Sequence, residues 1–209
     1  YTCGGSTTVA DRRIRCHKTT GHGTQTFTQT VMNSCNPAFI EWGRRVGVDN
    51  FYTYIDKLGL TSKTGIDIAG EAGTIIHKKE NVGEVELATM SFGQSFQITP
   101  MQMLRAAAAI VNGGNLVTPH FAIRTCDADK TTYSEFSYST TQEAVSKETS
   151  DTMKDILRQV VEEGGGKNAY IEGFSIGGKT ATSQKLPRGS GKYIASFIGF
   201  SDVTDPSVI

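Results

Sequence analysis

A lysine set between hydroxyl residues follows two glycines late in the chain, in the run Gly177-Gly178-Lys179-Thr180-Ala181-Thr182-Ser183. Side chains alternate faces along an extended strand, so Lys179 and Ala181 would share one face, opposite the two threonines. At a sheet edge, this strand could hold a carboxylate or pair with an extended peptide. Without a second motif, an ordinary exposed strand with a solvated lysine explains the run better.

The run Asn33-Ser34-Cys35-Asn36-Pro37, far upstream, supplies that second motif. A Ser-x-Asn triplet followed much later by Lys-Thr-Gly resembles two of the three active-site motifs of penicillin-binding proteins and serine β-lactamases. The third is Ser-x-x-Lys. Cys35 suggests a thiol nucleophile, but no histidine with a carboxylate or amide partner is arranged around it in the sequence. We therefore expect Cys35 to be a packed thiol.

Further short motifs occur in the order typical of one class of that family. They are Gly21-His22-Gly23, Thr64-Gly65-Ile66-Asp67, Gly70-Glu71, Ser91-Phe92-Gly93-Gln94, Thr99-Pro100-Met101-Gln102, Asn112-Gly113-Gly114 and Ser196-Phe197-Ile198-Gly199-Phe200. Together they resemble the transpeptidase domains of class B penicillin-binding proteins, the division and sporulation types above all. The resemblance extends over nearly the whole chain, and the ordered set is far more specific than any single motif.

The resemblance implies acyl transfer from a D-Ala-D-Ala stem peptide of peptidoglycan, with β-lactams as mimics of that dipeptide. It places Ser34 in a hydroxyl–lysine proton relay beside Lys179, and Asn36 at the amide carbonyl of the substrate. The hydroxyls of Thr180 and Thr182 would hold the terminal carboxylate. The backbone N–H of Thr182 would be one of two oxyanion donors, a contact worth roughly 3–4 kcal/mol in the transition state.

Two departures from the family pattern bear on this expectation. Ala181 replaces the glycine of Lys-Thr-Gly and adds a methyl group where the substrate should approach. Ser-x-x-Lys occurs nowhere in the 209 residues, so the nucleophile and its general base are missing. We therefore expect residues 1–209 to be a partial transpeptidase domain, incomplete at both ends and inactive alone. The alternatives are a degenerate peptide-binding module of this fold and a β-lactamase or D,D-carboxypeptidase.

Composition limits the partners of the chain. Its 21 basic and 21 acidic residues give a formal charge of zero, which gives no indication of a nucleic-acid partner. No apolar run approaches the ~18 residues that span a bilayer, so any membrane anchor would lie outside this chain. The resemblance implies a location on the outer face of the bacterial cytoplasmic membrane. It implies no cofactor.

The cysteines lack the spacing of a metal-binding framework. Cys3, Cys16, Cys35 and Cys126 show no Cys-x-x-Cys pattern, and we expect the four histidines not to cluster with them, so we expect no metal. A short stretch that could form a hairpin separates Cys3 from Cys16. The sequence leaves open whether these two pair as a disulfide, because position alone does not fix connectivity.

The hydrophobic periodicity predicts an α+β fold in which helices flank an antiparallel sheet, as in the β-lactamase and transpeptidase folds. Helices are expected from residue 24 to 33, then over 38–46, 50–58, 84–92, 100–111 and 147–163. Strands are expected over 66–68, 116–124, 173–183 and 193–201, the last two paired in antiparallel fashion. Residues 126–144 read as a hairpin or surface excursion.

Overall fold

The computed structural model describes residues 1–185, 187 and 190–209. The α-helices are α1 (Phe27–Met32), α2 (Asn36–Lys57), α3 (Glu84–Ser91), α4 (Pro100–Val111) and α5 (Lys147–Glu162), with 3-10 turns η1 (Lys79–Asn81) and η2 (Lys167–Ala169). The short strands are β1 (Thr2–Cys3), β2 (Ser6–Val9), β3 (Arg12–Arg15), β4 (Gly23–Thr24), β5 (Leu116–Val117), β6 (Arg124–Cys126), β7 (Tyr133–Glu135) and β8 (Thr140–Thr141). The two long strands are β9 (Ile176–Gln184) and β10 (Tyr193–Ser201).

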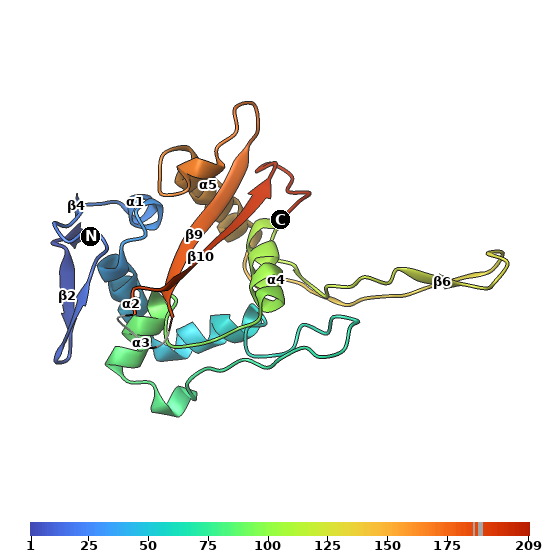
Figure 1. The fold of residues 1–209 in the computed structure, drawn as a ribbon, viewed down its shortest axis with the longest axis horizontal. Helices are drawn as coiled ribbons and strands as arrows, with labels where there is room; N and C mark the ends of the chain where they lie inside the picture. Colours follow the sequence, from blue (N-terminus) through green and yellow to red (C-terminus); the bar gives the residue numbers. More distant parts are fainter. Residues whose placement is uncertain (186, 188–189) are drawn as a thin grey trace.

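The long hairpin of β9 and β10 is the central sheet element (Figure 1). Its antiparallel register runs from Tyr193 opposite Gln184 to Ser201 opposite Ile176. Helix α5 packs against β9, and α4 packs against α5. The other described strands form four two-stranded antiparallel pairs: β1–β4, β2–β3, β5–β8 and β6–β7. The α+β class with antiparallel strands is therefore confirmed.

Helix boundaries follow local capping residues. The Thr26 hydroxyl accepts a hydrogen bond from the backbone N–H of Gln29 at 3.2 Å, and the Gln29 side chain accepts one from the backbone N–H of Thr26. These two bonds form a capping box at the start of α1. Thr99 and Gln102 form the same box at the start of α4. These pairs explain why the predicted and observed starts of α4 coincide.

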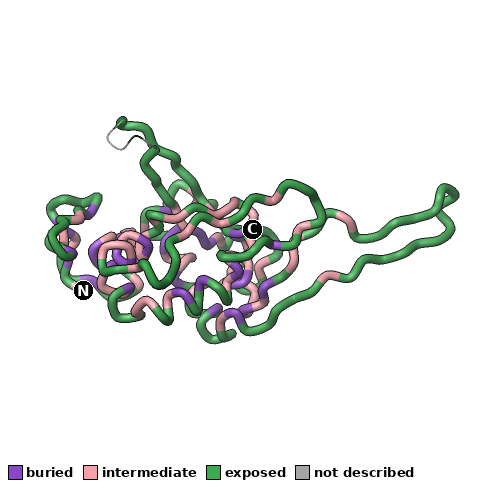
Figure 2. The backbone as a smooth tube through the Cα atoms, turned by 90° about the horizontal axis from the view of Figure 1, so that it is seen from below, coloured by how far each residue is buried: buried purple, intermediate pink, exposed green. Residues whose placement is uncertain are grey.

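Helix α2 combines the two helices that the sequence predicts around residues 38–46 and 50–58. Gly47 breaks the helical path with φ 74° and ψ 163°, a backbone conformation that favours glycine. The segment after this break packs on α3, where Tyr52, Ile55 and Met90 form a buried cluster. Buried positions lie mainly in this helical body, whereas the hairpins that project from it are largely exposed (Figure 2).

The segment 126–144 forms an exposed arm, as predicted, with β6 and β7 extending away from the body (Figure 1). The prediction of a strand over 116–124 is wrong in its middle, because pairing stops after Val117 and resumes at Arg124. The strand predicted over 66–68 is also absent. The Asp67 carboxylate there instead accepts hydrogen bonds from the backbone N–H groups of Phe121 and Ala122, at 3.0 and 2.7 Å. These bonds hold the segment as a loop in place of strand pairing.

None of the helices in the described residues is both long enough and apolar enough to span a membrane.

Candidate functional site

The Ser-x-Asn triplet occupies a sharp turn between α1 and α2. The N–H of Ser34 bonds to the carbonyl of Val31 at 3.1 Å, and the N–H of Cys35 bonds to the carbonyl of Thr30 at 3.0 Å. This pair of bonds is the Schellman arrangement, which usually has glycine at the left-handed position. Here Ser34 occupies it, with φ 46°. A left-handed non-glycine residue costs about 1–2 kcal/mol and persists only where surrounding contacts hold it.

The glycines before Lys179 make room for aromatic rings on the partner strand. A Cβ on Gly177 would meet the Phe200 ring at 2.3 Å, and one on Gly178 would meet the Phe197 ring at 2.4 Å. Glycine within a strand commonly marks such a close approach. The two rings fix how β10 lies beside β9, and β9 in turn carries Lys179 at a fixed position opposite Ile198.

Ser34 and Lys179 meet although 145 residues separate them. The Nζ of Lys179 donates a hydrogen bond to Ser34 Oγ and a second one, at 2.9 Å, to the carbonyl of Thr180. The predicted convergence of the two motifs is thus confirmed for this pair. Burial lowers the pKa of Lys179 below its ordinary value of 10.5. No carboxylate forms an ion pair with this lysine in the part of the chain that the structure describes, so its charge is uncompensated.

The remaining residues predicted for the site lie on the same two elements. Asn36 opens α2, two positions after Ser34, and is partly buried. Thr180 is partly buried, whereas Ala181 and Thr182 are exposed on the outer half of β9. The side chain of Asn36 forms no hydrogen bond with Lys179 or Ser34 within the described residues. The structure therefore brings the serine and lysine into contact, and the side chains of the other residues predicted for the site make no such contact within the described residues.

A groove of about 280 Å³ lies beside the outer end of β9. Its lining includes Ser183 and Gln184 of the strand and the segment 93–97, where the Ser-Phe-Gly-Gln motif ends. On its free side, β9 pairs with no other strand in the described parts of the chain. An extended ligand could therefore lie along β9 and reach this groove.

The comparisons with known proteins agree with this arrangement. The family model described as the penicillin binding protein transpeptidase domain matches residues 1–209. The chain belongs to this family. Among relatives, this transpeptidase domain is 44% identical over 209 residues to Stage V sporulation protein D of Bacillus subtilis, covering 98% of the chain and 32% of that protein.

Two solved structures resemble the transpeptidase domain closely. Penicillin binding protein 3 of Mycobacterium tuberculosis, in a complex with ampicillin, is 26% identical with a TM-score of 0.88, and the match covers 99% of this chain and 48% of that one. The D,D-transpeptidase domain of a peptidoglycan glycosyltransferase from Eggerthella lenta has a TM-score of 0.89 at 23% identity, covering 99% and 52%, which shows the shared fold alone. The chain spans about a third of the length of the curated relatives it matches.

A second polar cluster adjoins the Ser34 turn of the transpeptidase domain, and no sequence motif predicted it. Cys3, Cys16 and Cys35 are buried free thiols, and His22 lies with them. The predicted separation of cysteines and histidines is therefore wrong in three dimensions. The Cys3–Cys16 disulfide is not formed in this structure and stays a prediction.

The thiols in this cluster differ in acidity. Burial is the largest single influence on all three thiols; it raises the pKa of Cys16 and raises that of Cys35 to about 12. At Cys3, hydrogen bonds from the backbone of Gly5 and His22 and from the Cys35 and Cys16 side chains together outweigh burial, so the pKa of Cys3 is lowered. Burial also lowers the pKa of His22, with the neighbouring charges of His17 and Lys18 adding to it, so the imidazole is neutral near pH 7.

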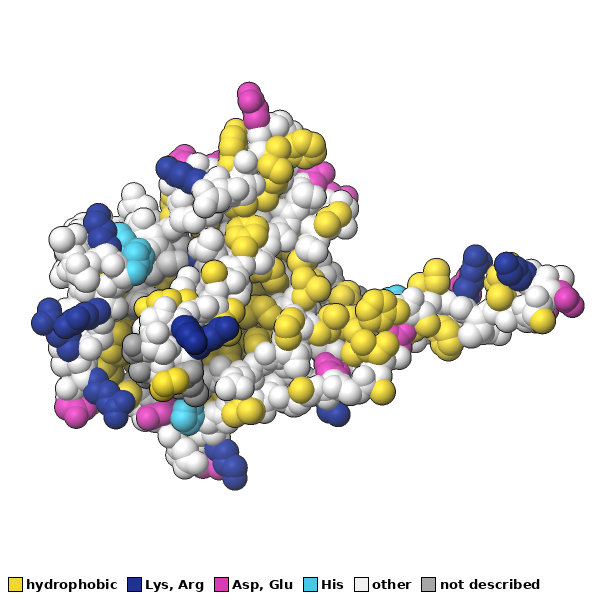
Figure 3. Space-filling view, viewed as in Figure 1, with side chains coloured by type: hydrophobic (Ala, Val, Ile, Leu, Met, Phe, Trp, Pro, Cys, Tyr) yellow, Lys and Arg dark blue, Asp and Glu magenta, His cyan; other side chains and the backbone are white. Residues whose placement is uncertain are grey.

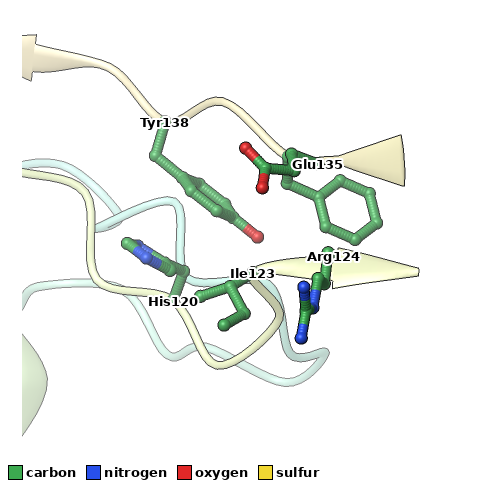
Figure 4. A pocket seen from close by; sticks show the side chains of 6 residues that line it. His120, Ile123, Arg124, Glu135 and Tyr138 are labelled. Carbon is green, nitrogen blue, oxygen red and sulfur yellow. The ribbon is translucent and has the colours of Figure 1, made fainter. Parts of the chain in front are cut away.

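A shallow pocket on the exposed arm contains none of the motif residues. Its lining comprises His120, Ile123, Arg124, Glu135, Phe136 and Tyr138 (Figure 4). The rings of His120 and Tyr138 stack with centroids 3.8 Å apart. The Tyr138 hydroxyl bonds to the carbonyl of Ala122 at 2.6 Å, so these groups hold the base of the arm together. We assign this pocket a structural role.

Proposed function

We propose that this chain contributes the substrate-holding wall of a D,D-transpeptidase that cross-links peptidoglycan stem peptides. The observation that carries the proposal is the contact between Lys179 and Ser34. It places an uncompensated, half-buried cation beside a hydroxyl, at the edge of a strand that can pair with a peptide. An anionic group such as the carboxylate of D-Ala-D-Ala would complement that charge.

In the proposed reaction, a serine oxygen bonds to the carbonyl carbon of the penultimate D-alanine. The peptide C–N bond breaks, and the released D-alanine nitrogen takes up a proton, which the Ser34 hydroxyl relays beside Lys179. The amine of a second stem peptide then attacks the acyl-enzyme, so that a new amide forms and the serine regains its proton. A β-lactam would open its ring at the equivalent C–N bond and remain attached.

Asn36 and the outer half of β9 position the substrate in this account. The side-chain amide of Asn36 would donate a hydrogen bond to the peptide carbonyl of the substrate, on the side of the substrate that faces away from β9. The hydroxyls of Thr180 and Thr182 would bind the carboxylate, and the Thr182 N–H would face the developing oxyanion. Ala181 lies between these threonines in the sequence, and its methyl group would narrow the approach without closing it.

The nucleophile of the reaction is not among these residues, since the 209-residue sequence contains no Ser-x-x-Lys. We propose that it is supplied by another part of the same protein, located outside the cytoplasm and exposed to peptidoglycan. The solved relative from Mycobacterium tuberculosis, captured with ampicillin, supports β-lactams as ligands of this domain type.

The test uses the full-length protein and a fluorescent penicillin. Lys179→Ala should lower the acylation rate constant by about 10²–10³-fold, the usual effect of removing one preorganised electrostatic contact. Lys147→Ala is the matched control, because Lys147 is an exposed lysine paired with Asp151 on α5 and should leave the rate unchanged. Equal labelling of wild type and Lys179→Ala would contradict the assigned role. Failure of the wild type to label would favour a peptide-binding module that has lost catalysis.

A further inference from the structure

Four potential metal ligands converge beside the Ser34 turn from four different segments. Cys3 ends β1, Cys16 follows β3, His22 precedes β4 and Cys35 caps the start of α2. The three sulfur atoms and a histidine ring nitrogen all lie within 4.8 Å of one another. The spacing is Cys-x12-Cys-x5-His-x12-Cys, which differs from familiar zinc motifs and explains why it gave no signal in the sequence.

The separations suit tetrahedral coordination. With zinc–sulfur bonds of about 2.3 Å and zinc–nitrogen bonds of about 2.0–2.1 Å, neighbouring ligand atoms lie roughly 3.5–3.8 Å apart. Cys16 Sγ and His22 Nδ1 are 3.6 Å apart, within that range. Sulfur and imidazole donors in a group of four are the ligand set of a structural zinc site.

The surrounding backbone holds the ligand segments tightly together. A Cβ on Gly21 would lie 2.2 Å from the carbonyl oxygen of Cys3, and one on Gly5 would lie 2.0 Å from that of Thr19. Both glycines have positive φ, so the close approach and the backbone conformation both require glycine. The Cys16 N–H also bonds to the Gly5 carbonyl at 2.9 Å. The geometry of the four donors is thus fixed by the backbone.

Gln25 adds an unused donor beside the cluster. Its side-chain oxygen accepts a bond from Asn33 at 2.8 Å, but its buried Nε2 has no hydrogen-bond partner in the part of the chain that is described. This amide lies against the thiol of Cys35. Buried donors without partners are uncommon, and a hydrogen bond to a metal-bound sulfur would satisfy this one.

We propose that Cys3, Cys16, His22 and Cys35 bind one Zn²⁺ ion in a closed tetrahedral site. On binding, the three thiols release their protons to solvent and four donor bonds form to the metal, with no redox change. The three thiolates and the dication leave one negative charge. Lysine and arginine side chains gather over this N-terminal part of the domain, which suits that charge (Figure 3).

A zinc site here would be structural, because all four positions are taken by protein ligands and none is left for water or substrate. Residues 1–24 carry only short strand pairs. The buried side chains at their contact with α2 are small, Cys3, Cys16, Cys35 and Ala38, with the partly buried Tyr1 packed against them. Zinc would tie these strands to Cys35, the middle residue of the Ser34–Asn36 turn. The metal would therefore hold the left-handed Ser34 in place without touching the substrate.

Two other states of the cluster make different predictions. A disulfide between two of the three thiols would remove two hydrogens and leave one thiol with His22. A reduced, metal-free thiol core would retain three protons. Both states would leave zinc unbound, so metal content distinguishes them from the proposal.

The test measures zinc in the full-length protein, purified in a reducing buffer without chelator and then incubated with zinc and desalted. We expect one zinc per chain by elemental mass spectrometry. After exchange with Co²⁺, the spectrum should show thiolate charge-transfer bands and the visible bands of tetrahedral cobalt. X-ray absorption at the zinc edge should resolve about three sulfur neighbours at ~2.3 Å and one nitrogen.

Cys3→Ser and His22→Ala each alter a proposed ligand. Zinc affinity should therefore fall by more than the roughly 10–100-fold that is typical when a residue hydrogen-bonded to a ligand is removed. Cys126→Ser is the matched control, because Cys126 is an exposed thiol on the arm, and it should keep one zinc per chain. Cys35 is not substituted, since it adjoins Ser34 and Asn36. Absence of zinc in the wild type, a zinc site lacking sulfur, or equal zinc in all three variants would overturn the proposal. The wild-type measurements remain decisive even where a variant does not fold.

Discussion

The turn at residues 34–36 has two sides that differ in almost every physical respect. On one side, Ser34 contacts Lys179 across an open strand edge, and the neighbouring Thr180 and Thr182, proposed to bind substrate, are at least partly accessible. On the other side, Cys35 is fully buried among Cys3, Cys16 and the adjacent imidazole. The accessible side suits reversible contacts with a substrate, whereas the buried side suits permanent ligation. One short turn therefore carries a reactive face and an anchoring face.

The strongest way to separate the two faces is to remove the Ser34 hydroxyl. In the full-length protein, Ser34→Ala should lower acylation by a fluorescent penicillin by about 10²–10⁴-fold, because a positioned proton relay contributes that much. Zinc content should be unchanged, since the Cys35 ligand remains. Measuring the acylation rate and the metal content of the same sample tests both statements, and loss of zinc in this variant would show that the faces are not independent.

Removing zinc should affect the reactive face more weakly. Stripping the wild-type protein with a high-affinity chelator should slow acylation by about 10–100-fold, because displacement of a positioning residue by about 1 Å costs this much. It should also lower the thermal midpoint. Adding zinc back should restore both within the same sample, and Cys126→Ser should respond as the wild type does. Unchanged acylation after complete zinc loss would mean that the anchor does not position Ser34.

The backbone strain at Ser34 should be measurable as stability. Glycine fits the left-handed position without a Cβ, so Ser34→Gly should be more stable than Ser34→Ala by about 1–2 kcal/mol. For a domain of this size, about 1 kcal/mol corresponds to a difference of roughly 2–4 °C in the thermal midpoint. Both variants lack the hydroxyl and should be equally poor in acylation. Equal midpoints in scanning calorimetry would argue against strain at this turn.

The smallest expected effect concerns the charge on Lys179. Burial lowers the pKa of Lys179 below 10.5, so between the lowered and the ordinary value the unfolded chain holds more protons than the folded one. Stability should therefore rise with pH across that window. Lys179→Met should flatten this rise relative to the wild type in urea unfolding measured at several alkaline pH values. A steeper rise in the variant would contradict the direction of the shift.

The reactive face could be predicted from the sequence because its residues belong to family motifs. The pairing of Ser34 with Lys179 was predictable from two motifs whose roles are coupled, and α4 was predictable from Thr99, Pro100 and Gln102 at its start. The loop at 66–68, where a strand was predicted, was not predictable in this way, because Asp67 binds the backbone of a segment far along the chain. Local alternation carries no information about such a partner.

The anchoring face escaped prediction for a related reason. Its ligands come from four segments, and the distances between Cys3, Cys16, His22 and Cys35 arise only when β1 pairs with β4 and α1 turns into α2. The Gly21-His22-Gly23 run was informative as a family motif, but it did not identify His22 as a ligand. One usable signal was the glycine beside His22, since Gly21 must pack against the Cys3 backbone.

The measurement that bears most directly on the function is the site of the penicilloyl group. After reaction of the full-length protein with penicillin, proteolysis and peptide mass spectrometry should locate the adduct on the serine of a Ser-x-x-Lys segment outside residues 1–209. The 209-residue chain alone should form no stable adduct, because it contains no Ser-x-x-Lys serine to be acylated. An adduct on Ser34 or Cys35 would contradict the account, because it would show that the nucleophile lies within the turn at residues 34–36.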